Sequence, residues 1–211
     1  MLREPTPVQA LAVVLAGPSG VGKSRLARHS GLPVLRLDDY YRDGDDTALP
    51  RIAAGTQGGN AGLVDWDDPA SWHHDDAVRA ICELAETGRT LAPLYDIARN
   101  RPSGTHLVAL DGAALFVAEG IFAQEVVAAC RRHGVLAAAL CLRQHPMVTF
   151  WRRLTRDLRE HRKPPLVLLR RGWALMRVQR RVIDEAARLG CEVVTVAQAE
   201  ARIRTLAAAR G

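Results

Sequence analysis

The residues with the clearest chemical meaning are GPSGVGKS, at positions 17–24, which have the spacing G-x-x-x-x-G-K-[ST] after an apolar run. Glycines at this spacing let backbone N–H groups surround phosphate oxygens, and the N-terminus of a following helix adds partial positive charge. We expect Lys23 to reach the terminal phosphates of a nucleotide and the Ser24 hydroxyl to ligate Mg²⁺. A glycine-rich turn without a ligand is the alternative, and the flanking patterns argue against it. The predicted ATP-binding residues are Gly17, Pro18, Ser19, Gly20, Val21, Gly22, Lys23, Ser24 and Arg25.

Two further apolar runs end in carboxylates. VLRLDD, at 34–39, ends in Asp38 and Asp39, and ALFVAEG, at 114–120, holds Glu119 before its last glycine. The C-terminal ends of parallel strands face the ligand in open α/β sheets, so these acids should lie near the phosphates. Asp38 could there deprotonate an attacking hydroxyl and contact Mg²⁺, and Glu119 could contact the metal. The alternatives are helix capping for Asp38 and, more strongly, for Asp39, and a buried salt bridge for Glu119.

A parallel sheet is needed to position these groups. Apolar runs of strand length alternate with helical patterns, which is typical of a parallel sheet covered by helices on both faces. The predicted fold is therefore an α/β P-loop NTPase with a five-stranded parallel sheet, a small β-hairpin and a helical lid. The predicted strands are 11–17, 34–39, 114–120, 135–142 and 192–196, with helices at 23–29 and 75–88, and with TLAPLYD (90–96) and HLVALD (106–111) forming a hairpin around RNRPSGT.

The 211 residues suffice for one substantial core, so we expect a single domain over 1–211. We place a substrate-binding insert at about 40–110 and the lid at about 146–165 within it. The stretch RRLTRDLREHRK, at 152–163, repeats basic residues at helical spacing. A lid that closes over ATP is favoured there over a solvated face, and both are favoured over a nucleic-acid surface.

Composition sets outer limits on partners and location. The formal net charge of +6 suits a polyanionic ligand, and nucleotide phosphates are one such ligand. The cysteines are widely spaced, which indicates neither a disulfide framework nor a zinc finger. The acidic and histidine-containing stretch DWDDPASWHHDD, at 65–76, fits no zinc template, so we do not expect a dedicated metal site there. No apolar run approaches the roughly 20 residues of a membrane span, and we expect a cytoplasmic protein.

Taken in order, the motifs resemble those of the uridine kinase family, within the phosphoribulokinase and uridine kinase-like P-loop kinases. The resemblance covers about 14–171, most of the chain, and its first motif is shared by many NTPases. The ordered set is more specific. It consists of GPSGVGKS, then LDDYYRD (37–43), DWDDPASW (65–72), PLYD (93–96), AEGIF (118–122) and RRLTRDLREHRK.

The resemblance implies a nucleoside-kinase-like fold and an ATP- and Mg²⁺-dependent transfer of the γ-phosphoryl group to a hydroxyl, most simply the 5′-hydroxyl of a nucleoside. It implies a catalytic set of Asp38, Lys23 and Arg156 and metal contacts from Ser24, Asp38 and Glu119. Arg156 resembles a lid arginine directed at the phosphates. The acceptor is expected at Tyr41, Asp67, Tyr95, Asn100 and Arg153, where Asp67 and Arg153 resemble residues that hold ribose hydroxyls. Relatives often assemble, so a homo-oligomer is one expectation.

Three positions depart from the family pattern. Asn100 stands where the hairpin usually continues to a histidine that reads the pyrimidine edge, His161 replaces a lid arginine, and Arg171 replaces a glutamine. An amide donates and accepts hydrogen bonds with a different geometry from an imidazole. The phosphate-transfer residues therefore match while base recognition differs. The alternatives are a kinase for a non-nucleoside acceptor, such as pantothenate or a sugar phosphate, and a nucleotide-binding regulatory protein without acceptor activity.

Overall fold

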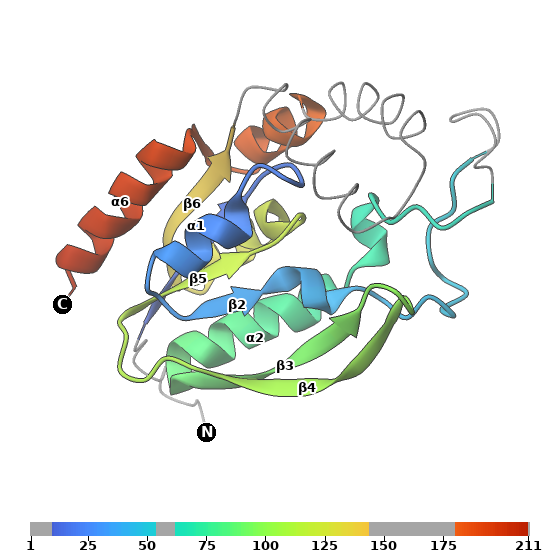
Figure 1. Ribbon diagram of the computed structural model, residues 1–211, viewed down its shortest axis with the longest axis horizontal. Coiled ribbons are helices and arrows are strands. Elements are labelled where there is room, and N and C mark those ends of the chain that lie inside the picture. Colours follow the sequence, from blue (N-terminus) through green and yellow to red (C-terminus); the bar gives the residue numbers. More distant parts are fainter. Residues whose placement is uncertain (1–9, 54–61, 144–179, 211) are drawn as a thin grey trace.

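The computed structural model describes residues 10–53, 62–143 and 180–210. Five parallel strands form the central sheet, in the order β2-β5-β1-β6-β7 (Figure 1). The strands are nearly continuous apolar runs because helices bury both of their faces. This confirms the predicted P-loop NTPase sheet. The strand bounds are Leu11–Ala16 for β1, Val34–Arg36 for β2, Leu115–Glu119 for β5, Leu136–Leu142 for β6 and Glu192–Val194 for β7.

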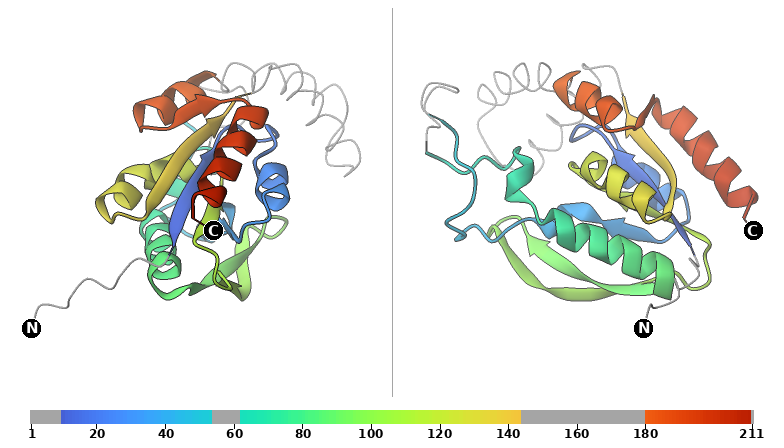
Figure 2. Two further views of the ribbon diagram at one scale, coloured as in Figure 1. Left: turned by 90° about the vertical axis from the view of Figure 1, so that its left-hand side faces the viewer. Right: turned by 180° about the vertical axis from the view of Figure 1, so that it is seen from behind.

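Helices cover the two faces of this sheet, as Figure 2 shows from the side. Alternate residues of β1 point to opposite faces, so Val14 packs into one buried cluster and Val13 into another. The Val14 cluster includes side chains from α2 and α3, and the Val13 cluster includes side chains from α1 and α6. The bounds are Lys23–His29 for α1, His74–Thr87 for α2, Val127–Arg132 for α3 and Val196–Ala208 for α6, and residues 180–188 are also helical.

A two-stranded antiparallel sheet, formed by β3 (Arg89–Asp96) and β4 (Arg101–Ala109), packs beside α2 (Figure 1). The hairpin was predicted, but its turn was placed too late, because β4 already begins at Arg101. The side chain of Asp96 accepts hydrogen bonds from the backbone N–H groups of Ala98 and Arg99, which starts the turn early. Strand pairing is irregular between Leu94 and Tyr95, opposite the segment that holds Pro102. That irregularity lets the proline join an edge strand.

The stretch LDDYYRD is a second point of difference. The predicted strand 34–39 ends at Arg36, and Leu37–Tyr40 form a 3₁₀ turn, η1. The carbonyl of Leu37 accepts a hydrogen bond of 2.7 Å from Nε1 of Trp72. Trp72 follows a second short turn, η2 (Pro69–Ser71), and forms an isolated antiparallel β-bridge with Tyr41. A long-range indole contact therefore fixes the turn that carries Asp38.

Helix α2 closely matches its predicted range. It ends at Gly88, whose φ of 77° lies in the left-handed region and whose N–H donates to the carbonyl of Leu84. Glycine reaches this conformation without steric cost, which explains the stop. Within the described ranges, no helix combines the length and the apolar character that a membrane crossing requires.

The Trp72 indole should contribute measurably to stability. Trp72→Phe removes the donor to the buried Leu37 carbonyl, and we expect a loss of about 1 to 3 kcal/mol in the free energy of unfolding. Urea denaturation measures this loss. Trp66→Phe, at a half-buried tryptophan of the same segment, is the control. A loss no larger for Trp72→Phe than for the control would contradict the role of the indole.

Candidate phosphate-transfer site

The phosphate-binding motif lies where β1 ends and α1 begins. Gly17 has a φ of 134°, and a Cβ on it would lie 2.8 Å from the carbonyl oxygen of Leu142 in β6. Both the backbone conformation and the close approach of the neighbouring strand therefore require glycine there. Gly22, with a φ of 110°, directly precedes α1, so the loop turns into the helix with its N–H groups exposed to a ligand.

Lys23 is buried, with 6% of its surface exposed, in a chain whose other basic residues are nearly all arginine. Its Nζ donates a hydrogen bond of 2.7 Å to the carbonyl of Gly17 and a longer one to that of Pro18. The ammonium group is thus held inside the loop that would surround the phosphates. A compact point charge suits this position better than a planar guanidinium.

Asp38 is held at the end of β5. Its Oδ1 accepts a hydrogen bond of 2.7 Å from the backbone N–H of Ile121. A Cβ on Gly120 would lie 2.9 Å from that same oxygen and 2.9 Å from Cβ of Leu37. Glycine at 120 therefore allows the turn η1 to pass directly over the end of β5. The half-buried carboxylate is oriented by the backbone and borders the cavity described below.

Glu119 is the acid beneath this site, and only 3% of its surface is exposed. Burial raises the pKa of its carboxyl group, and the charge of Asp38 adds to this, while a hydrogen bond from Ser24 and the charges of Lys23 and Arg36 oppose it. Its Oε2 has no hydrogen-bond partner among the described residues. A buried carboxylate oxygen without a partner, beside the Ser24 side chain, is a donor set that a divalent cation fits.

Mg²⁺ is usually held by one or two carboxylates, with water and substrate phosphates completing its octahedron. Ser24 and Glu119, with Asp38 nearby, match that pattern. Within the ranges that the structure describes, no group of three or more His, Cys, Asp or Glu side chains could hold a metal ion by itself. The arrangement therefore suits a cation that arrives with a nucleotide better than a cation held in an all-protein cage.

Asp39 differs sharply from its neighbour. It is 3% exposed, does not border the cavity, and lies 3.6 Å from Nε of Arg36. Burial raises the pKa of its carboxyl group, and Arg36 and the backbone N–H of Tyr95 oppose that rise. Neither aspartate is the N-cap of η1, because Arg36 occupies that position. Asp39 thus joins β2 to the hairpin, whereas Asp38 faces the cavity.

A cavity of about 720 Å³ lies between the phosphate loop and the hairpin. It brings together residues far apart in the sequence, and most of the predicted nucleotide and acceptor residues are among them. Glu119 and Asp67 are not part of the wall. The lining residues are Ser19, Gly20, Gly22, Lys23, Ser24, Arg25, Asp38, Tyr41, Trp66, Tyr95, Ile97, Asn100 and Ile121.

Aromatic rings form the wall opposite the phosphate loop. The ring centroid of Tyr41 lies 5.7 Å from that of Trp66, 5.8 Å from that of Tyr95 and 5.9 Å from that of Phe122. The Tyr41 hydroxyl donates to the carbonyl of Trp66, and the Tyr95 hydroxyl donates to the carbonyl of Arg42. Both hydroxyl hydrogens are therefore used by backbone carbonyls, while the phenol oxygens can still accept hydrogen bonds.

The remaining predicted acceptor residues lie differently. Asn100 is at the hairpin turn, has a φ of 51° and borders the cavity. Asp67 is exposed, and its backbone N–H donates to Asp65. Its charge is still close enough to raise the pKa of the Tyr41 hydroxyl, after the larger effects of burial and Asp38. The predicted lid at 146–165, with Arg153, Arg156 and His161, lies outside the described residues, and so does Arg171.

Sequence reasoning missed Trp66, Ile97 and Ile121 as cavity residues. Trp66 is the tryptophan of the DWDD segment, so an aromatic residue beside Asp67 was the available signal. Ile97 is 64% exposed, and an apolar residue at the first position of a hairpin turn was a weaker signal. Ile121 borders the cavity and donates its backbone N–H to Asp38, a contact that no side-chain pattern could have indicated.

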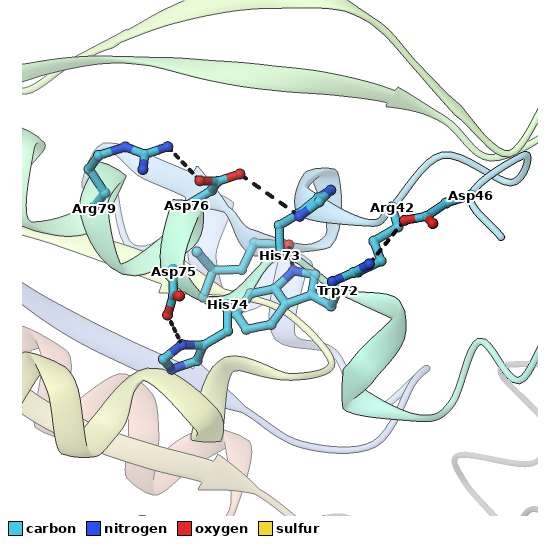
Figure 3. Close-up of polar contacts among 9 residues, drawn as sticks. Arg42, Asp46, Trp72, His73, His74, Asp75, Asp76 and Arg79 are labelled. Atoms are coloured by element: carbon cyan, nitrogen blue, oxygen red, sulfur yellow. Dashed lines mark hydrogen bonds and ion pairs between the residues drawn. The ribbon is translucent and has the colours of Figure 1, made fainter. Parts of the chain in front are cut away.

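The acidic and histidine-containing segment is engaged in surface contacts. Figure 3 shows His74 beside Asp75, and Asp76 between His73 and Arg79. Nδ1 of His74 lies 2.8 Å from Oδ1 of Asp75. Asp75 and Asp76 lie in the first turn of α2, where negative charge is favourable. These pairs support the start of the helix.

Comparisons with known proteins agree with the fold. No protein-family model matches the chain, and no curated protein matches it. A proposed fructose transport system kinase from Silicibacter sp. TM1040 superposes with a TM-score of 0.60, at 20% identity over 87% of each chain. A possible uridine kinase from Bacillus stearothermophilus gives a TM-score of 0.44, at 20% identity over 67% of this chain and 74% of the other. This chain has a P-loop kinase-like fold.

The contact between Gly120 and Asp38 can be tested directly. Gly120→Ala places a methyl group on Asp38 and Leu37, and overpacking of this kind costs about 1 to 3 kcal/mol. Denaturant unfolding should show that loss. Gly134→Ala is the control, because it has a φ of 69° but no atom within 4 Å of the added methyl group. Equal stability of Gly120→Ala and the wild type would mean that η1 does not lie over the end of β5.

Proposed function

We propose that the chain is a phosphotransferase that uses ATP and Mg²⁺ to phosphorylate a hydroxyl group of a small molecule. The observation that carries this proposal is the position of Asp38. Its carboxylate is oriented by the Ile121 N–H and borders one cavity together with Lys23, Ser24 and the glycines of the phosphate loop. A general base must be within hydrogen-bond reach of the hydroxyl from which it takes the proton, and the cavity offers the space for that hydroxyl.

In the proposed reaction the acceptor oxygen attacks the γ-phosphorus, and the bond from this phosphorus to the β–γ bridging oxygen breaks. ADP leaves, and the hydroxyl proton passes to Asp38. Lys23 and the loop N–H groups hold the phosphate oxygens and stabilise the charge that develops on them. Mg²⁺ at Ser24 and Glu119 would neutralise phosphate charge when bound. Arg153 and Arg156 belong to this proposal through the family resemblance alone.

The acceptor that best suits the cavity is uncharged and flat. Outside the phosphate loop and Arg25, Asp38 is the one charged residue among the described lining residues. Burial raises the pKa of the Tyr95 hydroxyl to about 12, and the nearby charge of Asp43 adds to the rise, so the phenol is neutral. Aromatic faces accept flat rings by offset or edge-to-face stacking. A nucleoside, with its 5′-hydroxyl near Asp38 and its base near Tyr41 and Tyr95, meets these requirements.

Removal of the proposed base should stop transfer and spare nucleotide binding. For Asp38→Asn we expect kcat to fall by about 10² to 10⁴, the range associated with general acid–base catalysis. Affinity for an ATP analogue, measured by calorimetry, should change little. Asp39→Asn is the matched control, and it should retain turnover within a few-fold. Full turnover by Asp38→Asn would remove this residue from the mechanism.

A thermal-shift panel should identify the acceptor class. In the presence of Mg²⁺ and a non-hydrolysable ATP analogue, we expect uridine or cytidine to raise Tm more than fructose, pantothenate or a sugar phosphate. Fructose is included because of the name of the structural neighbour. A larger shift with a non-nucleoside would redirect the proposal to that acceptor. Stabilisation by the ATP analogue with no response to any acceptor would support a regulatory nucleotide-binding protein.

A further inference from the structure

A short loop, residues 42–46, lies between the turn η1, which carries Asp38, and the tip of the hairpin. It directly follows Tyr41 in the chain, and it contacts the hairpin that carries Tyr95 and Asn100. The contacts are the Tyr95 hydroxyl to the Arg42 carbonyl at 3.0 Å, the Gly44 N–H to the Asn100 carbonyl at 2.6 Å, and the Arg101 guanidinium to the Asp45 carboxylate at 3.1 Å. Neither strand of the hairpin pairs with a strand of the five-stranded sheet, so contacts of this kind decide where the hairpin tip lies.

Gly44 is the closest point of this contact. A Cβ on Gly44 would lie 2.9 Å from Cβ of Asn100 and 2.9 Å from its carbonyl oxygen. The φ of Gly44 lies outside the left-handed region, so its backbone conformation is open to any residue. The structural reason for glycine is therefore the approach of Asn100 and not the backbone angle. Two of the three nearest atoms are backbone atoms of Asn100, which cannot move aside as a flexible side-chain end would.

Asn100 transmits this contact to the cavity. Its φ of 51° lies in the left-handed region, which asparagine adopts more readily than most residues. The turn is held at its other end by Asp96, which accepts from the N–H groups of Ala98 and Arg99. Asn100 borders the cavity, and both its Cβ and its carbonyl oxygen lie close to Gly44. A displacement of Asn100 by a larger residue at position 44 would therefore change the cavity wall.

We propose that Gly44 is a positioning residue for the acceptor, acting through Asn100 and Tyr95. By closing the loop 42–46 onto the hairpin tip, it fixes the far wall of the cavity relative to Asp38. This role rests on the proposed kinase function. The nucleotide side of the cavity belongs to β1 and α1, so changes at Gly44 act on the acceptor and leave the ATP site in place.

The test compares Gly44→Ala with Gly112→Ala. Gly112 has a φ of 86°, and an added methyl group there meets no atom within 4 Å, so that variant adds backbone strain without a new contact. With uridine as the probe, we expect the KM for uridine to rise about tenfold in Gly44→Ala, within the 10²-fold that a misplacement of about 1 Å can cost. The KM for ATP should not change. Gly112→Ala should change neither KM.

Hydrogen–deuterium exchange supplies a readout that needs no acceptor. Gly44→Ala should speed exchange in residues 95–101, with α1 and β1 unaffected, and Gly112→Ala should not. The double variant Gly44→Ala/Asn100→Gly removes the side-chain half of the contact and leaves the approach of the backbone carbonyl, so it should restore part of the protection, and it gives a second variant to measure if Gly44→Ala alone fails to fold. Unchanged exchange in 95–101, or equal effects of the two alanine variants, would overturn the role of Gly44. If the wild type phosphorylates no acceptor, the kinase proposal fails, while the exchange result still decides whether Gly44 fixes the hairpin.

Discussion

The close approach between the end of β5 and the turn η1 is the constraint on which the rest of the site depends. Glu119 lies between Leu15 of β1 and Arg36 of β2 in the sheet register. The phosphate loop follows β1, and Asp38 follows β2, so both reach the same strand end. Because Gly120 carries no side chain, the Asp38 carboxylate can accept the Ile121 N–H there. One glycine therefore allows Asp38 to lie against the strand end that carries Glu119.

Polar and charged neighbours partly offset the burial of two ionisable side chains in this site. Lys23 and Glu119 are both nearly inaccessible to solvent, and burial raises the pKa of the Glu119 carboxyl group. The loop carbonyls hold the ammonium group, while Ser24, Lys23 and Arg36 counter the raised pKa of Glu119. Under the proposed function, a nucleotide triphosphate would bring negative charge to Lys23, and its cation would bring positive charge to Glu119.

The sequence predicted what local pattern controls and missed what distant contacts decide. The five strands and the glycine-rich loop between β1 and α1 follow from apolar runs and a fixed glycine spacing, and these elements were located correctly. The early end of β2 depends on a hydrogen bond between Leu37 and Trp72, 35 positions apart. The start of β4 depends on Asp96 closing the turn before Pro102. Trp66 reaches the cavity beside Tyr41, 25 positions earlier in the chain, and Ile97 lies on the hairpin tip that contacts the loop 42–46.

The backbone at Asn100 bears on the departure from the family pattern, which has a histidine at this position. The resemblance to uridine kinases draws attention to the missing histidine, whereas the structure gives the position a backbone role, because its left-handed φ and its carbonyl support the contact with Gly44. An amide side chain is shorter than an imidazole, and the phenols of Tyr41 and Tyr95 already donate to carbonyls. Under the proposed function, the aromatic rings beside these hydroxyls would stack on a base, and stacking depends weakly on base identity because every base has a π-face. Such a wall would favour flat over non-flat acceptors more strongly than one base over another.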